Sequence, residues 1–334
     1  MSEVKPLDRL VVVAGPTAVG KSRLAFELAR ENQGELLCAD SRQIYKDLDI
    51  GTAKPSRAEQ AAIPHHLFDI ADPRETFTVV EYLAAAEIAL ADIWNRGKLP
   101  VIVGGTGLYL KSLLYAYKIP EVAPQIELRQ NLLAAETEQG EGHLHQRLSQ
   151  MDPVAAARLH PNDLRRVVRA LEVIAVTGQP ISAQQSREPK LRYPCLYLGL
   201  SMPRPRLEER IEQRIAEMIQ TGLIDEVKSL RERYGADLPL LQTLNYREIG
   251  DYLDGKMDLP AAMKAMHIHT RQYAKRQMTW FRKDPGIHWL ALEQADLSVH
   301  APWLQCQGLK CGTAALNPEP ALSSELSPEL TGRH

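Results

Sequence analysis

Short apolar runs alternate with stretches of helical spacing through the first third of the chain. Residues 10–14 form a continuous apolar run that predicts a buried strand, and residues 22–30 then place apolar side chains three and four positions apart, as in a helix. The same alternation continues, with strands expected over 35–39, 67–70 and 100–103 and a helix over 78–96. Strands that alternate with helices predict an α/β fold built on a parallel sheet with flanking helices.

The middle of the chain lacks strand signals, and its pattern predicts helices. Helices are expected over 126–139 and 164–177, separated by prolines, before a strand over 196–200 returns the chain to the sheet. Charged helices over 205–234 and 261–282 and a short strand over 287–290 follow. The predicted organisation is a core of residues 8–117 and 194–292, a helical insert over 118–193, and a disordered tail over 313–334 that is rich in Pro, Ser and Glu.

Composition excludes several classes of protein. The 334 residues are 44% hydrophobic and 25% charged, and no stretch approaches the roughly 20 apolar residues of a membrane span. The N-terminal residues also lack the apolar segment of a signal peptide, so we expect a cytoplasmic protein without membrane contact. The four cysteines include no C-x-x-C pair, and the net charge of -2 means that any nucleic acid must bind to local basic patches.

A phosphate-binding loop lies between the first strand and the first helix. The segment G-P-T-A-V-G-K-S fits the pattern G-x-x-x-x-G-K-[ST] and comprises Gly15, Pro16, Thr17, Ala18, Val19, Gly20, Lys21 and Ser22. Backbone amides and the helix N-terminus would face phosphate oxygens, Lys21 would add a point charge, and the Ser22 hydroxyl could bind Mg²⁺. The loop predicts a polyphosphate ligand without specifying a nucleoside.

Two further segments follow the carboxyl ends of predicted strands. These are D-S-R-Q-I-Y-K-D-L-D-I-G-T-A-K-P from Asp40 and G-G-T-G-L-Y from Gly104. Because parallel strands bind ligands at that edge, Asp40, Ser41 and Thr106 should line the same crevice as Lys21. From these residues alone, Asp40 could be a general base or a Mg²⁺ ligand, and Thr106 could be a helix N-cap.

Seven segments in this order resemble tRNA dimethylallyltransferases, the IPP transferase family. They are G-P-T-A-V-G-K-S, D-S-R-Q-I-Y, D-I-G-T-A-K-P, P-H-H-L, G-G-T-G-L-Y, R-A-L-E and R-Q-Y-A-K-R-Q-M-T-W-F-R, between about residues 10 and 289. The resemblance implies a P-loop NTPase-like sheet domain with a helical insertion domain. It also implies transfer of dimethylallyl from dimethylallyl diphosphate to N6 of adenosine 37, beside the anticodon, in tRNAs that read codons beginning with U.

The resemblance also assigns catalytic roles. Asp40 would orient the adenine amine and accept its proton, and Thr106 would bond the bridging oxygen of the leaving group. Lys21 and Arg214 would hold the diphosphate, with Arg210 as a second candidate, and Ser22 would bind the Mg²⁺ cofactor.

The resemblance further implies a set of contacts with the tRNA anticodon stem-loop. They are Asp40, Ser41, Arg42, Gln43, Thr106, Arg129, Arg165, Arg166, Arg169, Gln242, Tyr246, Arg247, Arg271 and Lys275. Without the resemblance, Arg165, Arg166 and Arg169 would be explained as a solvated charged face of a helix rather than as tRNA contacts. At the position of Arg165 the family commonly has Gln. Asn245 stands where the family often has Gly, and Asn tolerates a left-handed backbone.

Other functions remain open at this point. A P-loop small-molecule kinase would explain the phosphate loop but not the helical insert or the basic helices. An adenylate isopentenyltransferase would prenylate a free nucleotide, and a nucleotide-switched RNA-binding module would perform no transfer. We expect a monomeric prenyltransferase that modifies tRNA.

Overall fold

The computed structural model describes residues 9–115, 120, 122–184 and 190–292, which form two compact units. The sheet unit consists of the described parts of 1–76, 88–107 and 195–334, and the helical unit of those of 77–87 and 108–194. The predicted tail over 313–334 lies outside the described residues. No helix of the described residues combines the length and the apolar composition that crossing a membrane requires.

The sheet unit is built on six parallel strands in the order β3-β2-β4-β1-β5-β6. The strands are β1 (Leu10–Ala14), β2 (Gly34–Cys38), β3 (His65–His66), β4 (Leu99–Gly104), β5 (Cys195–Ser201) and β6 (His288–Ala291). In the centre of the sheet, Val13 of β1 pairs with Val103 on one side and Leu198 on the other. The predicted parallel α/β sheet is confirmed.

One predicted strand is wrong. The apolar residues 67–70 were expected to form the third strand, whereas β3 comprises His65 and His66 only. Leu67 and Asp69 have φ angles of 66° and 56°, so the backbone leaves the extended conformation at once. The side chain of His66 instead bonds Glu35 at 2.7 Å, and the His65 ring contacts the carbonyl of Ile63, both of which are structural roles.

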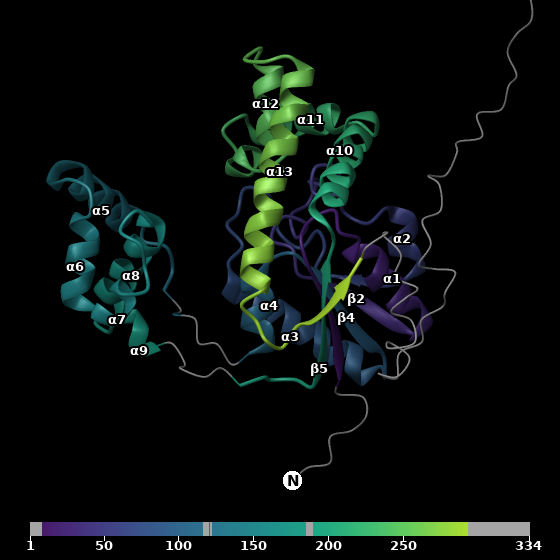
Figure 1. The fold of residues 1–334 in the computed structure, drawn as a ribbon, viewed down its shortest axis with the longest axis horizontal. Helices are drawn as coiled ribbons and strands as arrows, with labels where there is room; N and C mark the ends of the chain where they lie inside the picture. Colours follow the sequence, from purple (N-terminus) through teal and green to yellow (C-terminus); the bar gives the residue numbers. More distant parts are fainter. Residues whose placement is uncertain (1–8, 116–119, 121, 185–189, 293–334) are drawn as a thin grey trace, which may run out of the picture. The chain divides into compact units, whose positions relative to one another are not determined.

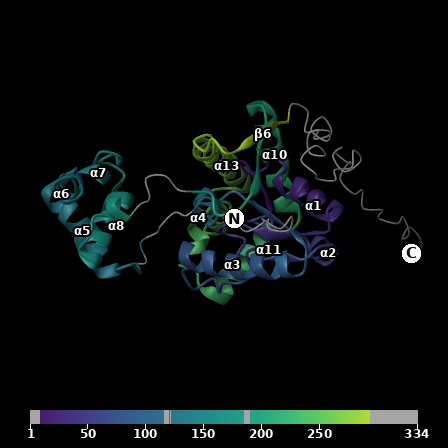
Figure 2. The ribbon, with the colours of Figure 1, turned by 90° about the horizontal axis from the view of Figure 1, so that it is seen from below.

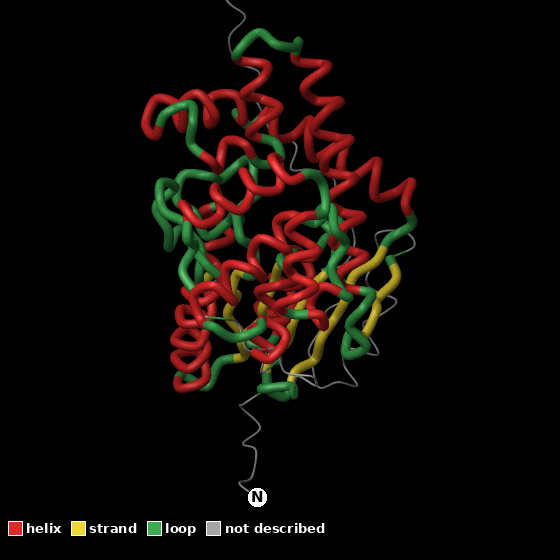
Figure 3. Tube along the Cα trace, turned by 90° about the vertical axis from the view of Figure 1, so that its left-hand side faces the viewer, coloured by secondary structure: helices red, strands yellow, loops and turns green. Residues whose placement is uncertain are grey.

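The helices of the sheet unit gather around the strands and beyond their carboxyl ends (Figures 1 and 3). They are α1 (Lys21–Glu31), α2 (Arg57–Ala62), α10 (Arg204–Gln220), α11 (Leu223–Tyr234), η1 (Pro239–Gln242), α12 (Tyr246–Leu253) and α13 (Leu259–Phe281). The helix α13 contacts α10 and α12, and α11 contacts its neighbours α10 and α12. The stretch predicted as helical over 205–234 is two helices, because Gly222 with φ 104° separates them.

The main core lies between the central strands and α1. All five residues of β1 are buried, as the continuous apolar run predicts for a strand covered on both faces. Val11 and Val13 pack in one cluster with Leu24 and Leu28, which are four positions apart on α1. This packing fixes the first turn of α1, and therefore Lys21, directly beyond the end of β1.

The helical unit is a separate group of helices (Figure 2) with a smaller core of its own. It contains α5 (Ile126–Gln139), α6 (His143–Met151), α7 (Pro153–Ala156), α8 (Leu164–Thr177) and α9 (Ile181–Gln184), while α3 (Val79–Asn95) and α4 (Gly107–Leu114) run across the boundary between the units. Leu132, Leu148 and Leu171 meet in its core. The helix α8 has the predicted bounds, since Asp163 caps its first turn and Gly178 ends it in a left-handed conformation.

A buried carboxylate holds this helical unit together. Glu172 on α8 has no exposed surface and accepts bonds from the guanidinium of Arg129 at 2.8 and 2.9 Å and from Arg169 at 2.5 Å. It also accepts the backbone N–H of Gln125. Burial alone would raise the pKa of Glu172, but these bonds outweigh it and lower the pKa to about 2.

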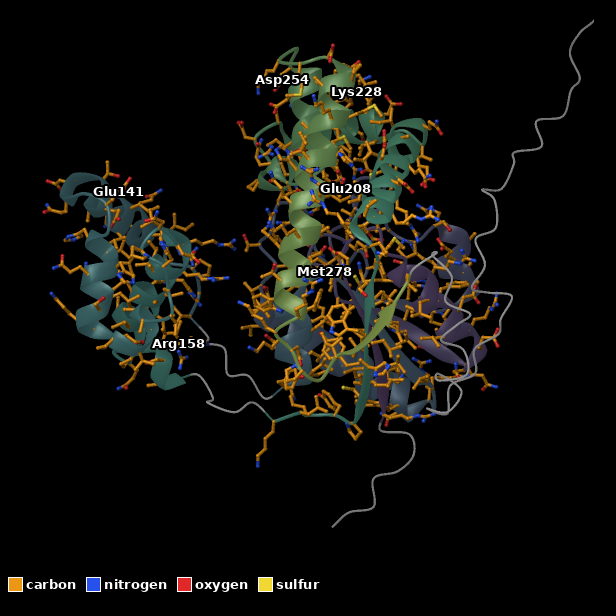
Figure 4. All side chains as sticks on the ribbon, viewed as in Figure 1. Glu141, Arg158, Glu208, Lys228, Asp254 and Met278 are labelled. Atoms are coloured by element: carbon orange, nitrogen blue, oxygen red, sulfur yellow. The ribbon has the colours of Figure 1, made fainter. Side chains whose placement is uncertain are left out.

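We expect Glu172→Gln to destabilise the helical unit by about 2 kcal/mol at neutral pH, because two arginines lose their buried counter-ion. Since the folded pKa lies near 2 and the unfolded value near 4.3, the wild type should lose this stability as the pH falls through that window, whereas the variant should not. Urea unfolding at several pH values measures both effects. Glu141→Gln, an exposed change in the same unit (Figure 4), is the matched control, and equal acid sensitivity of all three proteins would contradict the assignment.

Candidate functional site

The phosphate loop, Gly15–Ser22, joins β1 to α1 as the sequence predicts. Its turn needs left-handed backbone at Ala18 and Gly20, whose φ angles are 63° and 104°. A Cβ on Gly15 would lie 2.7 Å from the carbonyl oxygen of Leu200, so β5 approaches too closely for any side chain. The Lys21 ammonium folds back over the loop and donates to the carbonyl of Pro16 at 2.7 Å.

Two arginines that make no hydrogen bond or ion pair with another described residue lie beside this loop. Arg210 and Arg214 lie one turn apart on α10, and neither guanidinium has a hydrogen bond or an ion pair with another described residue. Arg210 lies over Gly20, where an added Cβ would be 3.7 Å from Nη1. Burial lowers the pKa of both arginines, and burial together with Arg214 lowers the pKa of Lys21 to about 7. Unpaired buried cations are unfavourable, so this arrangement favours binding of an anion.

The carboxyl ends of β2 and β4 bring Asp40, Ser41 and Thr106 together. The Thr106 hydroxyl accepts the backbone N–H of Ser41 at 3.0 Å, and the Thr106 N–H donates to the carbonyl of Ala39 at 3.1 Å. Because Oγ1 accepts the bond from Ser41, its own proton is free for another acceptor. One oxygen of Asp40 accepts the N–H of Arg42 at 2.9 Å, which orients the carboxylate.

The glycines of the G-G-T-G segment are explained by close packing. A Cβ on Gly104 would overlap the backbone of Ala39, and one on Gly107 would overlap the indole of Trp280. A Cβ on Gly105 would overlap the side-chain amide of Gln277, which lies on α13. This segment therefore needs glycine for close approach rather than for an unusual backbone angle.

The loop that follows Asp40 is held by one carboxylate from α11. Glu226 accepts the backbone N–H groups of Asp49, Ile50 and Gly51 at 2.7–3.1 Å and the hydroxyl of Tyr246 at 2.8 Å. Asn245 has φ 72°, which confirms the positive-φ backbone expected there, and its amide donates to Gly51.

Three cavities of the sheet unit meet at Arg214. The large cavity, of about 1040 Å³, is lined by Lys21, Arg23, Arg210 and Arg214 on its cationic side. The middle cavity, of about 340 Å³, is lined by Asp40, Ser41, Arg214, Thr270 and Tyr273 among others. The small cavity, of about 150 Å³, contains Lys21, Asp40 and Arg214 beside the apolar side chains of Phe26, Leu36, Phe68 and Val103.

The remaining predicted tRNA contacts lie in varied surroundings. Tyr246 is 1% exposed beneath the loop held by Glu226, and the amide of Gln43 donates to the carbonyls of Thr52 and Ala53. The side chains of Arg129 and Arg169 are 38% and 29% exposed, and both pair with the buried Glu172. Arg42 in the turn after β2, Arg165 and Arg166 on α8, Gln242 on η1, Arg247 on α12 and Lys275 on α13 are exposed. Arg271 is half-buried, with its guanidinium 3.6 Å from Glu208.

Comparison with known proteins adds to this geometry. The family model for IPP transferase matches residues 43–284, and the model for isopentenyl transferase matches residues 8–66. A tRNA dimethylallyltransferase of Synechococcus sp. strain JA-3-3Ab is 52% identical over 288 residues, which cover 86% of this chain and 83% of that protein. The chain belongs to the IPP transferase family. This confirms the resemblance predicted from the seven sequence segments.

Solved structures of IPP transferases share the fold. The tRNA isopentenylpyrophosphate transferase of Bacillus halodurans is 38% identical with a TM-score of 0.67, covering 90% of this chain and 95% of that chain. A eukaryotic dimethylallyltransferase, crystallised while acting on tRNA, is 30% identical with a TM-score of 0.75, covering 90% of this chain and 77% of its own. The P-loop NTPase-like sheet predicted for this IPP transferase is therefore confirmed.

The lowered pKa of Lys21 makes a prediction for diphosphate binding. A bound anion favours the ammonium form, so the affinity should be highest below about pH 7 and fall by up to about tenfold per pH unit above it. Calorimetric titration with inorganic diphosphate between about pH 6 and about pH 9 measures this. Because diphosphate itself titrates, the affinity of the wild type is divided by that of Lys21→Met at each pH. An affinity ratio that does not change with pH would contradict the prediction.

Proposed function

We propose that this chain transfers the dimethylallyl group of dimethylallyl diphosphate to N6 of adenosine 37 in tRNAs that read codons beginning with U. The relatives that cover most of the chain are named tRNA dimethylallyltransferases, which supports the activity. The observation that carries the mechanism is the meeting of three cavities at Arg214, with the cations Lys21 and Arg210 lining the large cavity and Asp40 lining the middle and small cavities.

In this proposal the diphosphate occupies the cationic side of the large cavity. Lys21 and Arg214 neutralise its charge, the loop amides donate to its oxygens, and Arg210 adds a second guanidinium. The dimethylallyl group extends into the small cavity, where Phe26, Phe68 and Val103 provide apolar surface. This arrangement keeps the first allylic carbon near the junction of the cavities.

The adenine enters the middle cavity from the tRNA side after it leaves the anticodon stack. Its N6 lone pair attacks the first allylic carbon while the bond from that carbon to the diphosphate oxygen breaks. Asp40 accepts the proton that N6 loses, because the amine is a weak base whose lone pair is delocalised into the ring. The products are N6-(dimethylallyl)adenosine and diphosphate.

Thr106 acts on the leaving group. Its hydroxyl accepts the N–H of Ser41, so the hydroxyl proton points to a different acceptor, and the bridging oxygen of the substrate fills that role. A hydrogen bond to an oxygen whose charge grows in the transition state accelerates the cleavage.

Magnesium fits the residues around Ser22. The side chain of Ser22 is exposed in the first turn of α1 and lines both the large and the small cavities. One hydroxyl, diphosphate oxygens and water form the oxygen set that Mg²⁺ prefers. When bound, the ion would neutralise charge on the departing diphosphate.

The tRNA contacts in this proposal come from both units. In this proposal Ser41, Arg42, Gln43 and Thr106 contact the target nucleotide, and the exposed Gln242, Arg247 and Lys275 with the half-buried Arg271 contact the surrounding RNA. Tyr246 is 1% exposed and lines the middle cavity, so its contact is with the adenine there. The helical insert over 118–193 contributes Arg165 and Arg166, which are exposed, and Arg129 and Arg169, whose guanidinium groups keep part of their surface open beside Glu172. We further propose that the enzyme acts as a monomer, since residues of one chain line all three cavities, and that it acts in the cytoplasm.

The first experiment supplies Mg²⁺ and labelled dimethylallyl diphosphate with either unmodified tRNA or AMP. Label in tRNA alone would support the proposal. Label in AMP alone would favour an adenylate isopentenyltransferase, and label in neither would leave a P-loop kinase or an RNA-binding switch as the better explanation.

We expect Asp40→Asn to lower kcat by about 10²- to 10⁴-fold, because the amide orients the amine but accepts no proton. Diphosphate and tRNA affinities should change little. Single-turnover transfer and equilibrium binding measure these quantities, with the exposed Asp225→Asn on α11 as the matched control. A variant with near-normal kcat would eliminate Asp40 as the base.

Thr106 allows a matched pair of variants. Thr106→Ser keeps the hydroxyl and should retain most of the activity, whereas Thr106→Val should lower kcat by about 10²-fold because one transition-state hydrogen bond is lost. Equal rates for the two variants in single-turnover transfer would contradict this role.

A further inference from the structure

Gln277 is a buried amide in α13 that contacts two separate loops of the site. Its side chain is 6% exposed, Oε1 accepts the backbone N–H of Thr17 at 2.9 Å, and Nε2 donates to the carbonyl of Gly105 at 3.0 Å. These partners are 260 and 172 positions away in the chain. One side chain therefore joins three distant segments of the sheet unit.

The two contacts require a carboxamide. One partner is a donor and the other is an acceptor, and a neutral amide offers one group of each kind in a rigid plane. The contact with Gly105 is close enough that a Cβ there would overlap Nε2. If the amide were absent, the partly buried N–H of Thr17 and the buried carbonyl of Gly105 would lose their partners.

The helix that carries Gln277 is itself firmly packed. Ala274 and Phe281 are buried on the same face, and Trp280 lies against Gly107, just beyond the loop that Gln277 contacts. The helix also contacts α10, which carries the unpaired arginines, and α12. The amide therefore has a fixed position, against which the two loops are held.

Both of those loops carry groups that act on the diphosphate in the proposed function. Thr17 belongs to the phosphate loop with Lys21, and Gly105 immediately precedes Thr106. We propose that Gln277 is a positioning residue that sets the separation of these loops, so that Lys21 and Thr106 act on the same leaving diphosphate. This inference rests on the proposed function, and it adds a role for α13 beyond contact with tRNA.

The test compares Gln277→Met with the wild-type enzyme. Met has a similar length but makes neither hydrogen bond, so kcat should fall by about 10- to 100-fold through misplaced loops, with the KM for tRNA within about twofold of wild type. Affinity for inorganic diphosphate should fall by about three- to tenfold, because the amides of the phosphate loop lose their alignment. Gln272→Met, an exposed change on the same helix, is the matched control.

Gln277→Glu supplies a readout that a purely structural role would not move. Its ionised carboxylate can accept from Thr17 but cannot donate to Gly105, whereas the protonated form can do both. The kcat of this variant, divided by that of wild type at each pH, should therefore rise as the pH falls. Gln272→Glu should show a flat ratio.

Three results would overturn the inference. They are wild-type kcat and diphosphate affinity in Gln277→Met, a loss of tRNA affinity as large as the loss of kcat, and a pH-independent ratio for Gln277→Glu. Inactive wild-type enzyme would refute the proposed function instead, and the diphosphate titration would still decide whether Gln277 aligns the phosphate loop. If Gln277→Met fails to fold, the kcat ratio of Gln277→Glu to wild type at two pH values tests the same inference.

Discussion

Positive charge withdrawn from water is concentrated at the carboxyl ends of the central strands. Lys21, Arg210 and Arg214 are withdrawn from water, and the two arginines form no hydrogen bond or ion pair with another described residue. Such groups are tolerated when the rest of the fold holds them rigidly and a ligand completes the charge balance. The parallel sheet provides that rigidity, because its buried strands end together and direct their loops toward α10.

The loops around this charge are held by polar side chains from distant helices. Glu226 fixes the loop after Asp40 through three backbone N–H groups, and Gln277 fixes the phosphate loop and the loop before Thr106. Both side chains come from the helices that follow β5. The C-terminal helices thus complete the site as well as offering a basic surface, which explains why a phosphate loop alone does not define this enzyme.

The predicted tRNA contacts illustrate how one residue type can have two roles. Arg129 and Arg169 neutralise Glu172 inside the helical unit, yet both retain exposed surface. Arg165 and Arg166, which lie on α8 with Arg169, are exposed, and Arg166 pairs with the partly exposed Asp163. Charge count along a helix does not separate these roles, because the separation depends on whether a buried carboxylate lies within reach.

The sequence by itself determined the parallel α/β fold, the phosphate loop, the bounds of α8 and the family, because each of these depends on local periodicity or on residues at fixed spacing. It failed at residues 67–70, where positive φ angles override an apolar run. It also missed Gln277, although a polar residue among the buried positions Thr270, Ala274 and Phe281 was a signal. Only the tertiary structure decided the partners of Gln277, Glu226 and Glu172, since hydrogen bonds between segments far apart in the chain leave no periodic pattern in the sequence.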